Sequence, residues 1–244
     1  MNRRRHGPET KTSKLAILVP LALSGLVLGG AFLANSGLRH MREPDSVARL
    51  QTAENDFRAG SGAAAVRLFT PLAKAGNTTA QYWLAKMYLY GTDIKPDATH
   101  AIDLLTKAAS HGNVAAELLL GETYLNGLHT LQDFRQARLW LGKAAHAGNA
   151  PAERDLARIY AQGWGVAPDP VEAYAWDAVA AAHGDAWATS ERNRILRTLA
   201  GPELTEAQAR ARSLNATIGA AAAPSSSIAE GNPTANPLAP SDQG

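Results

Sequence analysis

The chain has 244 residues, of which 45% are apolar, with 24 lysine and arginine residues against 22 aspartate and glutamate residues and an isoelectric point near 8.9. This length and apolar content allow one or two domains with a sizeable core, and they exclude a chain that is disordered throughout. The sequence contains no cysteine, which excludes disulfides, thiolate nucleophiles and metal sites held by thiolates.

The excess of positive charge lies at the N-terminus. Residues 1–14 carry five basic residues and one acidic residue, a net charge of +4. Residues 216–244 carry two acidic residues and no basic one, which leaves 19 of each sign between residues 15 and 215. The basic isoelectric point therefore gives no support to a nucleic-acid partner, and we expect none.

An uncharged segment of twenty residues, 15–34, follows the basic start. A helix of this length spans about 30 Å, the thickness of a bilayer's hydrocarbon core. The basic residues before it predict a cytoplasmic N-terminus (1–14), a linker (35–45) and a periplasmic remainder. Two interpretations stay open: a single-pass anchor in the inner (cytoplasmic) membrane, which we favour, or a signal peptide whose cleavage leaves a secreted or periplasmic protein.

Five sets of residues recur with a period of 36 through the middle of the chain, which identifies an internal repeat. The sets are Gly76, Gly112, Gly148 and Gly184; Gly91, Gly127 and Gly163; Tyr88, Tyr124 and Tyr160; Ala80, Ala116, Ala152 and Ala188; and Asp97, Asp133 and Asp169.

Each repeat predicts a pair of helices. Ala80, Leu84 and Tyr88 are four residues apart and share one helical face. Gly91 follows where a residue with positive φ can end that helix, and Asp97 is placed to cap the next one. A lone helix pair cannot bury its apolar face, but stacked pairs share a continuous core.

We therefore expect an all-α fold, a right-handed α-solenoid of 36-residue helix-turn-helix repeats, preceded by one transmembrane helix. The full repeats are 78–113, 114–149 and 150–185, within a solenoid at 46–215 that includes flanking partial repeats and a C-terminal cap. Three pairs have capping-box spacing: Asp133 with Gln136, Asp169 with Glu172, and Thr205 with Gln208. The last pair predicts a final helix through about Asn215, and the Ala-, Ser- and Pro-rich residues 216–244 predict a disordered tail.

The repeat resembles the Sel-one-like repeat family, short relatives of the tetratricopeptide fold. The resemblance rests on Leu-Gly-x-x-Tyr-x-x-Gly at 120–127, on Trp-Leu-x-Lys-Ala-Ala-x-x-Gly at 140–148, and on Gly-x-Gly-Val-x-x-Asp at 163–169, which is one residue longer than usual. Departures are Val179, where Lys107 and Lys143 stand, and residues 128–130 in place of a Gly-Val loop. The resemblance implies a protein-binding scaffold without catalysis, often at work in the bacterial envelope.

The sequence offers no sign of catalytic, cofactor or metal chemistry, and we expect no enzyme. No two histidines have the helical spacing of metal ligands, and there is neither a phosphate loop nor a Gly-x-Ser-x-Gly elbow. Histidines near the ends of second helices are expected to bond free carbonyl groups: these are His111, His146 and His183. Four carboxylates are expected to be solvated: Glu117, Glu122, Glu153 and Asp155.

Aromatic residues divide into repeated and unrepeated ones. Trp140 and Trp176 align with Leu104 and are predicted to lie in the core. The unrepeated aromatic residues are better binding candidates, since the scaffold does not require them: Tyr82, Trp83, Tyr90, Trp164 and Trp187.

The tetratricopeptide resemblance implies that first helices line a concave groove, with three inward positions each. Those positions are Tyr82, Lys86 and Tyr90; Leu118, Glu122 and Asn126; and Arg154, Arg158 and Gln162. All but Leu118 are predicted partner-binding residues. A segment with an apolar anchor followed by acidic residues would suit this groove.

The sequence thus predicts a membrane-anchored periplasmic scaffold or adaptor that binds a peptide or helix of an envelope protein. Two alternatives remain: a module that binds envelope glycans through the unrepeated aromatic residues, and a secreted regulator with the same repeats.

Overall fold

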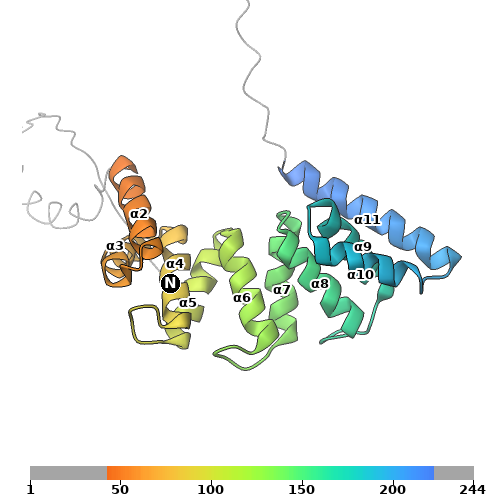
Figure 1. The fold of residues 1–244 in the computed structure, drawn as a ribbon, viewed down its shortest axis with the longest axis horizontal. Coiled ribbons are helices and arrows are strands. Elements are labelled where there is room, and N and C mark those ends of the chain that lie inside the picture. The colour runs from red at the N-terminus through yellow and green to blue at the C-terminus, as the bar shows by residue number, and fades with distance from the viewer. Residues whose placement is uncertain (1–42, 223–244) are drawn as a thin grey trace, which may run out of the picture. The chain divides into compact units, whose positions relative to one another are not determined.

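The computed structural model describes residues 43–222, and within that range the chain forms ten α-helices and no strand (Figure 1). In chain order they are α2 (Glu43–Arg58), α3 (Gly62–Lys74), α4 (Thr78–Tyr90), α5 (Ala98–Ser110), α6 (Val114–Asn126), α7 (Phe134–His146), α8 (Ala150–Gln162), α9 (Pro170–Ala182), α10 (Ala186–Leu196) and α11 (Gly201–Ala222). The expected all-helical solenoid is confirmed for this range, whereas its right-handed sense stays a prediction.

The predicted membrane segment, 15–34, and the basic residues before it lie outside the described residues. Between residues 43 and 222, no helix combines the length and the apolar character needed to cross a bilayer.

The helices pair as the repeat predicts. α4 with α5, α6 with α7, and α8 with α9 form the full repeats, and each of these six helices has 13 residues. Consecutive helices pack against each other from α2 through α10. α11 lies across α9 and also reaches α7, so that it covers the C-terminal end of the repeats (Figure 1).

Each first helix begins at a side-chain cap. The oxygen of Asn77, one residue after a glycine, accepts the backbone N–H of Ala80 at 2.8 Å, which satisfies a donor that the first turn leaves free. The next three first helices have the same cap, with Asn113, Asn149 and Asp185 as acceptors. Gly91, with φ of 67°, ends α4 in the left-handed region, as its column predicts.

Small residues set the spacing between helices. Every alanine of the Ala80 column is fully buried, and so are Ala101, Ala137 and Ala173 of the second helices. Trp140 and Trp176 are 8% and 2% exposed, which confirms their place in the core. A methyl group added at Gly121 would lie 2.6 Å from Cγ of Leu141, so the helices approach too closely there for any side chain.

The loop of the first full repeat caps a helix of the preceding pair. Ser61 precedes α3 but makes no capping bond with its own side chain. Instead Oδ2 of Asp93, 31 residues away, accepts the backbone N–H of Gly62 at 2.9 Å. Asp93 makes this bond to Gly62 with a φ of 57°, a conformation that non-glycine residues seldom adopt.

The predicted caps need two corrections. Asp133 and Asp169 do cap α7 and α9, but neither forms a complete capping box. The backbone N–H of Asp133 donates to the backbone carbonyl of Tyr124, and that of Asp169 to the carbonyl of Tyr160, so neither N–H bonds to the side chain three residues later. Thr205 caps no helix: its hydroxyl donates to a carbonyl inside α11, and the carboxylate of Glu203 accepts the N–H of residue 200 at the start of that helix.

The last helix is also longer than expected. It continues to Ala222, past the predicted end at residue 215. The reason is packing: Leu214 and Ile218 are 3% and 2% exposed and belong to the same apolar cluster as Trp176. The guanidinium of Arg210 adds an ion pair to Glu172 of α9 at 2.6 Å.

Two glycines provide a matched test of this architecture. Gly165 has φ of 67°, and a Cβ there would lie 2.7 Å from Cβ of Phe134, whereas a Cβ at Gly142, inside α7, would meet nothing within 4 Å. Gly165→Ala should lower the free energy of unfolding by about 1–3 kcal/mol. Gly142→Ala should raise it by about 0.5–1 kcal/mol. Urea unfolding followed by circular dichroism measures both, and equal effects of the two changes would contradict this account.

Candidate functional site

The predicted partner-binding residues lie at matching positions on three successive first helices. We call this set the strip: Tyr82, Lys86 and Tyr90 on α4, Glu122 and Asn126 on α6, and Arg154, Arg158 and Gln162 on α8. All of its side chains are at least partly accessible, and three of them are exposed: Tyr90, Asn126 and Gln162.

The first end of the strip is aromatic. The pKa of the Tyr82 phenol is raised above its usual value by burial, and further by Tyr90 and Glu122, so these groups lie within electrostatic reach of each other. The ammonium of Lys86 lies 6.0 Å from the centre of the Tyr82 ring. Tyr90 is 55% exposed and meets the ring of His129 edge-on at 6.3 Å. Together these rings offer a partner apolar area with polar edges.

Glu122 connects the three helices electrostatically. Burial raises the pKa of its carboxyl group, as does Asp155, whereas Arg154 and Lys86 lower it. The strip therefore carries alternating charges along its middle.

The two arginines of the strip are already paired. Nη1 of Arg154 lies 2.8 Å from Oδ2 of Asp185, and Nη1 of Arg158 lies 3.1 Å from Oδ1 of Asp155. The expected basic end of the groove is therefore neutralised by carboxylates, because Asp155 and Asp185 lie beside the arginines. This removes the reason for expecting an acidic partner segment there.

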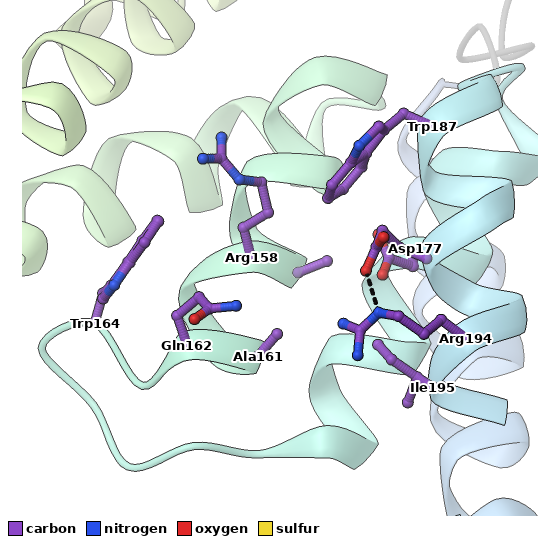
Figure 2. Close-up of a pocket in the computed structure, with 10 residues that line it drawn as sticks. Arg158, Ala161, Gln162, Trp164, Asp177, Trp187, Arg194 and Ile195 are labelled. Atoms are coloured by element: carbon purple, nitrogen blue, oxygen red, sulfur yellow. Dashed lines mark hydrogen bonds and ion pairs between the residues drawn. The ribbon is translucent and has the colours of Figure 1, made fainter. Parts of the chain in front are cut away.

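A hollow of about 210 Å³ opens beside this end of the strip, between α8, α9 and α10. We call it the Asp177 hollow. Figure 2 shows Arg158 and Gln162 of α8 on one side, Trp187 and Arg194 of α10 on the other, and Asp177 of α9 between the two α10 side chains. Trp187 is 45% exposed, so an aromatic face is available at the mouth of the hollow.

Asp177 lies at the base of the hollow and is incompletely bonded. Its side chain is 2% exposed, and Oδ1 has no hydrogen-bond partner. Burial, reinforced by Glu191 and Asp185, raises the pKa of this carboxyl to about 7, even though Arg194 and Arg154 act in the opposite direction. Glu191 holds Arg194 in an ion pair at 2.7 Å, so this guanidinium does not neutralise Asp177 directly. A buried carboxyl oxygen without a partner, beside a hollow, is suited to form a hydrogen bond with an incoming polar group.

Comparison with known proteins agrees with the repeat spacing. A family model described as the Sel1 repeat matches residues 78–113, 114–149 and 150–185. The matched segments coincide with the three full repeats of the chain. Proteins built of such repeats are generally protein-interaction scaffolds.

Solved structures of Sel1 repeat proteins are similar to this chain. A Sel1 repeat protein from Oxalobacter formigenes is 26% identical, over 72% of this chain and 73% of that protein, with a TM-score of 0.57. A protective antigen present in uropathogenic Escherichia coli strains, with an SLR fold, is 23% identical over 77% of this chain and 50% of its own, with a TM-score of 0.43. No curated protein matches the sequence.

The full repeats bury three carboxylates that were expected to be solvated. Glu117, Glu153 and Asp155 are 6%, 0% and 4% exposed. Glu117 and Glu153 occupy the same repeat position as Gln81, which is also buried, so their 36-residue spacing was the missed signal. Burial raises the pKa of both glutamates.

Glu153 has a different partner from Glu117, because the third repeat has other residues around this position. In the second repeat Lys143 acts electrostatically on Glu117, but valine stands at the matching position 179. His183, one turn later, places Nδ1 2.9 Å from the carboxylate of Glu153. The expected carbonyl contact of His183 was therefore wrong, whereas His111 and His146 do make it, at 2.8 and 2.7 Å.

The unrepeated aromatic residues differ in how much of each ring is accessible. Trp83 packs against Phe57 at 5.1 Å, and Trp164 stacks on Phe134 at 5.7 Å, so both are partly committed to the fold. Tyr90 is exposed at the first end of the strip, and Trp187 is exposed on α10, beside the other end. In residues 43–222 no cluster of three or more histidine, aspartate or glutamate side chains could hold a metal ion.

The raised pKa of Asp177 predicts a pH dependence of stability. An unfolded aspartate has a pKa of about 4, so the protonated Asp177 stabilises the fold fully below pH of about 4, and this contribution is lost as the pH rises through about 7. Asp177→Asn keeps a neutral group there. The gain in unfolding free energy of this variant over the wild type should grow by on the order of 4 kcal/mol between pH 4 and pH 8, because a shift of about three pKa units is worth about 1.4 kcal/mol per unit.

The control is Asp103→Asn, on the exposed face of α5, whose difference from wild type should change little over the same range. Urea unfolding at a series of pH values provides the measurement. Parallel pH profiles of Asp177→Asn and the wild type would contradict the burial of a neutral carboxyl.

Proposed function

We propose that this protein is a non-catalytic scaffold of the bacterial envelope, which binds a peptide or helix of a partner protein along the strip. The observation that carries the proposal is the set of accessible side chains at matching positions on α4, α6 and α8, with Trp187 and the Asp177 hollow beside the α8 end. Three Sel1 repeats provide the rigid frame for these side chains.

The chemistry of the strip selects a partner with apolar or aromatic anchors. Tyr90 and Trp187 present the exposed rings, and rings of this kind contribute much of the binding energy in protein interfaces. Between them the charges are paired or alternate in sign, so a strongly acidic or strongly basic segment gains little. Next to Trp187, the unpaired Oδ1 of Asp177 favours a polar group of the partner that forms a hydrogen bond with it.

Photocrosslinking in intact cells tests the strip. A benzophenone amino acid placed at Tyr90 or Trp187 should capture the same partner protein, whereas the same group at Leu139, which is 50% exposed on the second helix α7, should not. Tyr90→Ala and Trp187→Ala should each weaken binding of that partner about tenfold or more by calorimetry, and Leu139→Ala should leave it unchanged. Equal capture from all three positions, or capture of glycan instead of protein, would contradict the proposal.

We also propose that residues 15–34 anchor the chain in the inner membrane and that the Sel1 repeats lie in the periplasm. The support is the length of this uncharged segment and the net charge of +4 before it. An anchor would hold the strip near the membrane surface, where an envelope partner is available to it.

Membrane fractionation with N-terminal sequencing tests the anchor. The full-length chain should remain in the membrane fraction after a high-salt wash, because a spanning apolar helix is not released by ionic strength. Inverting the charge of residues 3–5 with three glutamates is the matched variant and should reduce correct insertion. A mature chain that starts near residue 32 or 35 would show a cleaved, secreted or periplasmic form instead.

A further inference from the structure

The first Sel1 repeat lacks a large side chain that the other two repeats contain. Leu104 occupies the position of Trp140 and Trp176, and the three second helices have matching bounds. All three side chains are buried to a similar degree, at 7%, 8% and 2% exposure. The frame of the repeat therefore accommodates an indole at this position, whereas in the first repeat it holds only an isobutyl group.

A hollow of about 620 Å³ lies at this position in the structure. We call it the Leu104 hollow. It lies between α3, α4 and α5, with Leu84 and Leu104 as apolar lining and with Tyr88, His100 and Lys107 among the groups around it. The ring of Tyr88 meets that of His100 edge-on at 4.7 Å, which makes part of the wall aromatic.

An unpaired buried oxygen belongs to the same hollow. Gln81 is 7% exposed, and its Nε2 donates to the carbonyl of Ala73 at 3.1 Å, while its Oε1 has no hydrogen-bond partner. Both residues line the Leu104 hollow. A buried acceptor of this kind is costly until a donor reaches it.

In the second repeat, a lysine side chain contacts the indole ring of Trp140. The ammonium of Lys143 lies 4.2 Å from the centre of the Trp140 ring, a cation–π distance. Lys107 is the matching residue in the first repeat and lies at the edge of the Leu104 hollow, where it pairs with Asp103 at 2.6 Å. The first repeat thus retains the cation of this arrangement without the ring.

We propose that the Leu104 hollow is a second binding site, which takes the indole of a tryptophan side chain from a partner protein. The ring occupies the space that Trp140 fills in the next repeat, under Lys107, and its N–H donates to Oε1 of Gln81. The site is separate from the strip, because Gln81, Leu84 and Tyr88 lie on the opposite face of α4 from the strip residues at 82, 86 and 90, at about 100° per residue.

A peptide probe tests the site directly on the full chain. The probe is an acetylated Gly-Ser-Trp-Ser-Gly peptide with 5-fluorotryptophan, observed by fluorine NMR. It should bind the wild type, and an unlabelled leucine peptide should compete at least tenfold more weakly. An N-methylindole peptide should compete several-fold more weakly, because it cannot donate to Gln81. Failure of the wild type to shift or broaden the fluorine signal would overturn the proposal, as would equal competition by the leucine peptide.

Three variants separate this site from the rest of the fold. Leu104→Trp fills the hollow from within and should abolish probe binding while it leaves the circular dichroism spectrum unchanged. Lys107→Met alters an exposed side chain, so that folding is not at risk, and should weaken binding several-fold. Gln81→Met should remove the preference for the indole over the N-methylindole. Unaltered probe binding by Leu104→Trp or by Lys107→Met would overturn the assignment.

Each site's variant is also measured in the other site's assay, which distinguishes the strip from the Leu104 hollow. Tyr90→Ala should leave probe binding unchanged, and Leu104→Trp should leave capture of the strip's partner unchanged. Sedimentation of the wild type and of Leu104→Trp identifies the source of the indole. A dimer that Leu104→Trp dissociates would place Trp187 of a second copy in the hollow, and would overturn the assignment to a partner protein.

Discussion

Close approach between helices at alanine is the constraint on which the rest of the structure depends. A pair of 13-residue helices has too little apolar area to be stable alone, so each pair must lie tightly against the next. The Ala80 column permits this because its members have no side chain beyond Cβ and are fully buried. The caps at Asn77 and its equivalents begin each first helix at the same position of the repeat, which keeps the alanines in register from repeat to repeat.

Once the spacing is fixed in this way, polar groups at certain repeat positions are buried whatever their chemistry. Gln81, Glu117 and Glu153 share one such position, and each repeat provides for it differently: a backbone carbonyl, a nearby lysine and a histidine. Asp177 and Gln81 keep one unbonded oxygen each, and both oxygens belong to hollows. The regular packing of the repeats therefore leaves some buried polar groups without a full set of hydrogen bonds. These groups line the two candidate binding sites.

The sequence predicts the frame of this protein far better than its sites. Periodicity locates both helices of each full repeat, because the glycine, alanine and aspartate columns reflect backbone geometry that every repeat must satisfy. The pairing of Glu153 with His183 and that of Arg154 with Asp185 depend on contacts between residues about 30 apart, which no local pattern contains. The end of α11 was missed for the same reason, since Ile218 is held by the cluster around Trp176 and not by capping signals. The Leu104 hollow could have been inferred from the Leu, Trp, Trp column alone.

The bond from Asp93 to the first turn of α3 links the N-terminal helix pair to the first full repeat. α3 has no capping side chain of its own, and the acceptor of its first turn belongs to the loop between α4 and α5. The N-terminal helix pair therefore depends on the first full repeat, while that repeat has its own caps at Asn77 and Asp97. We therefore expect local opening of the described region to begin at α2 and α3.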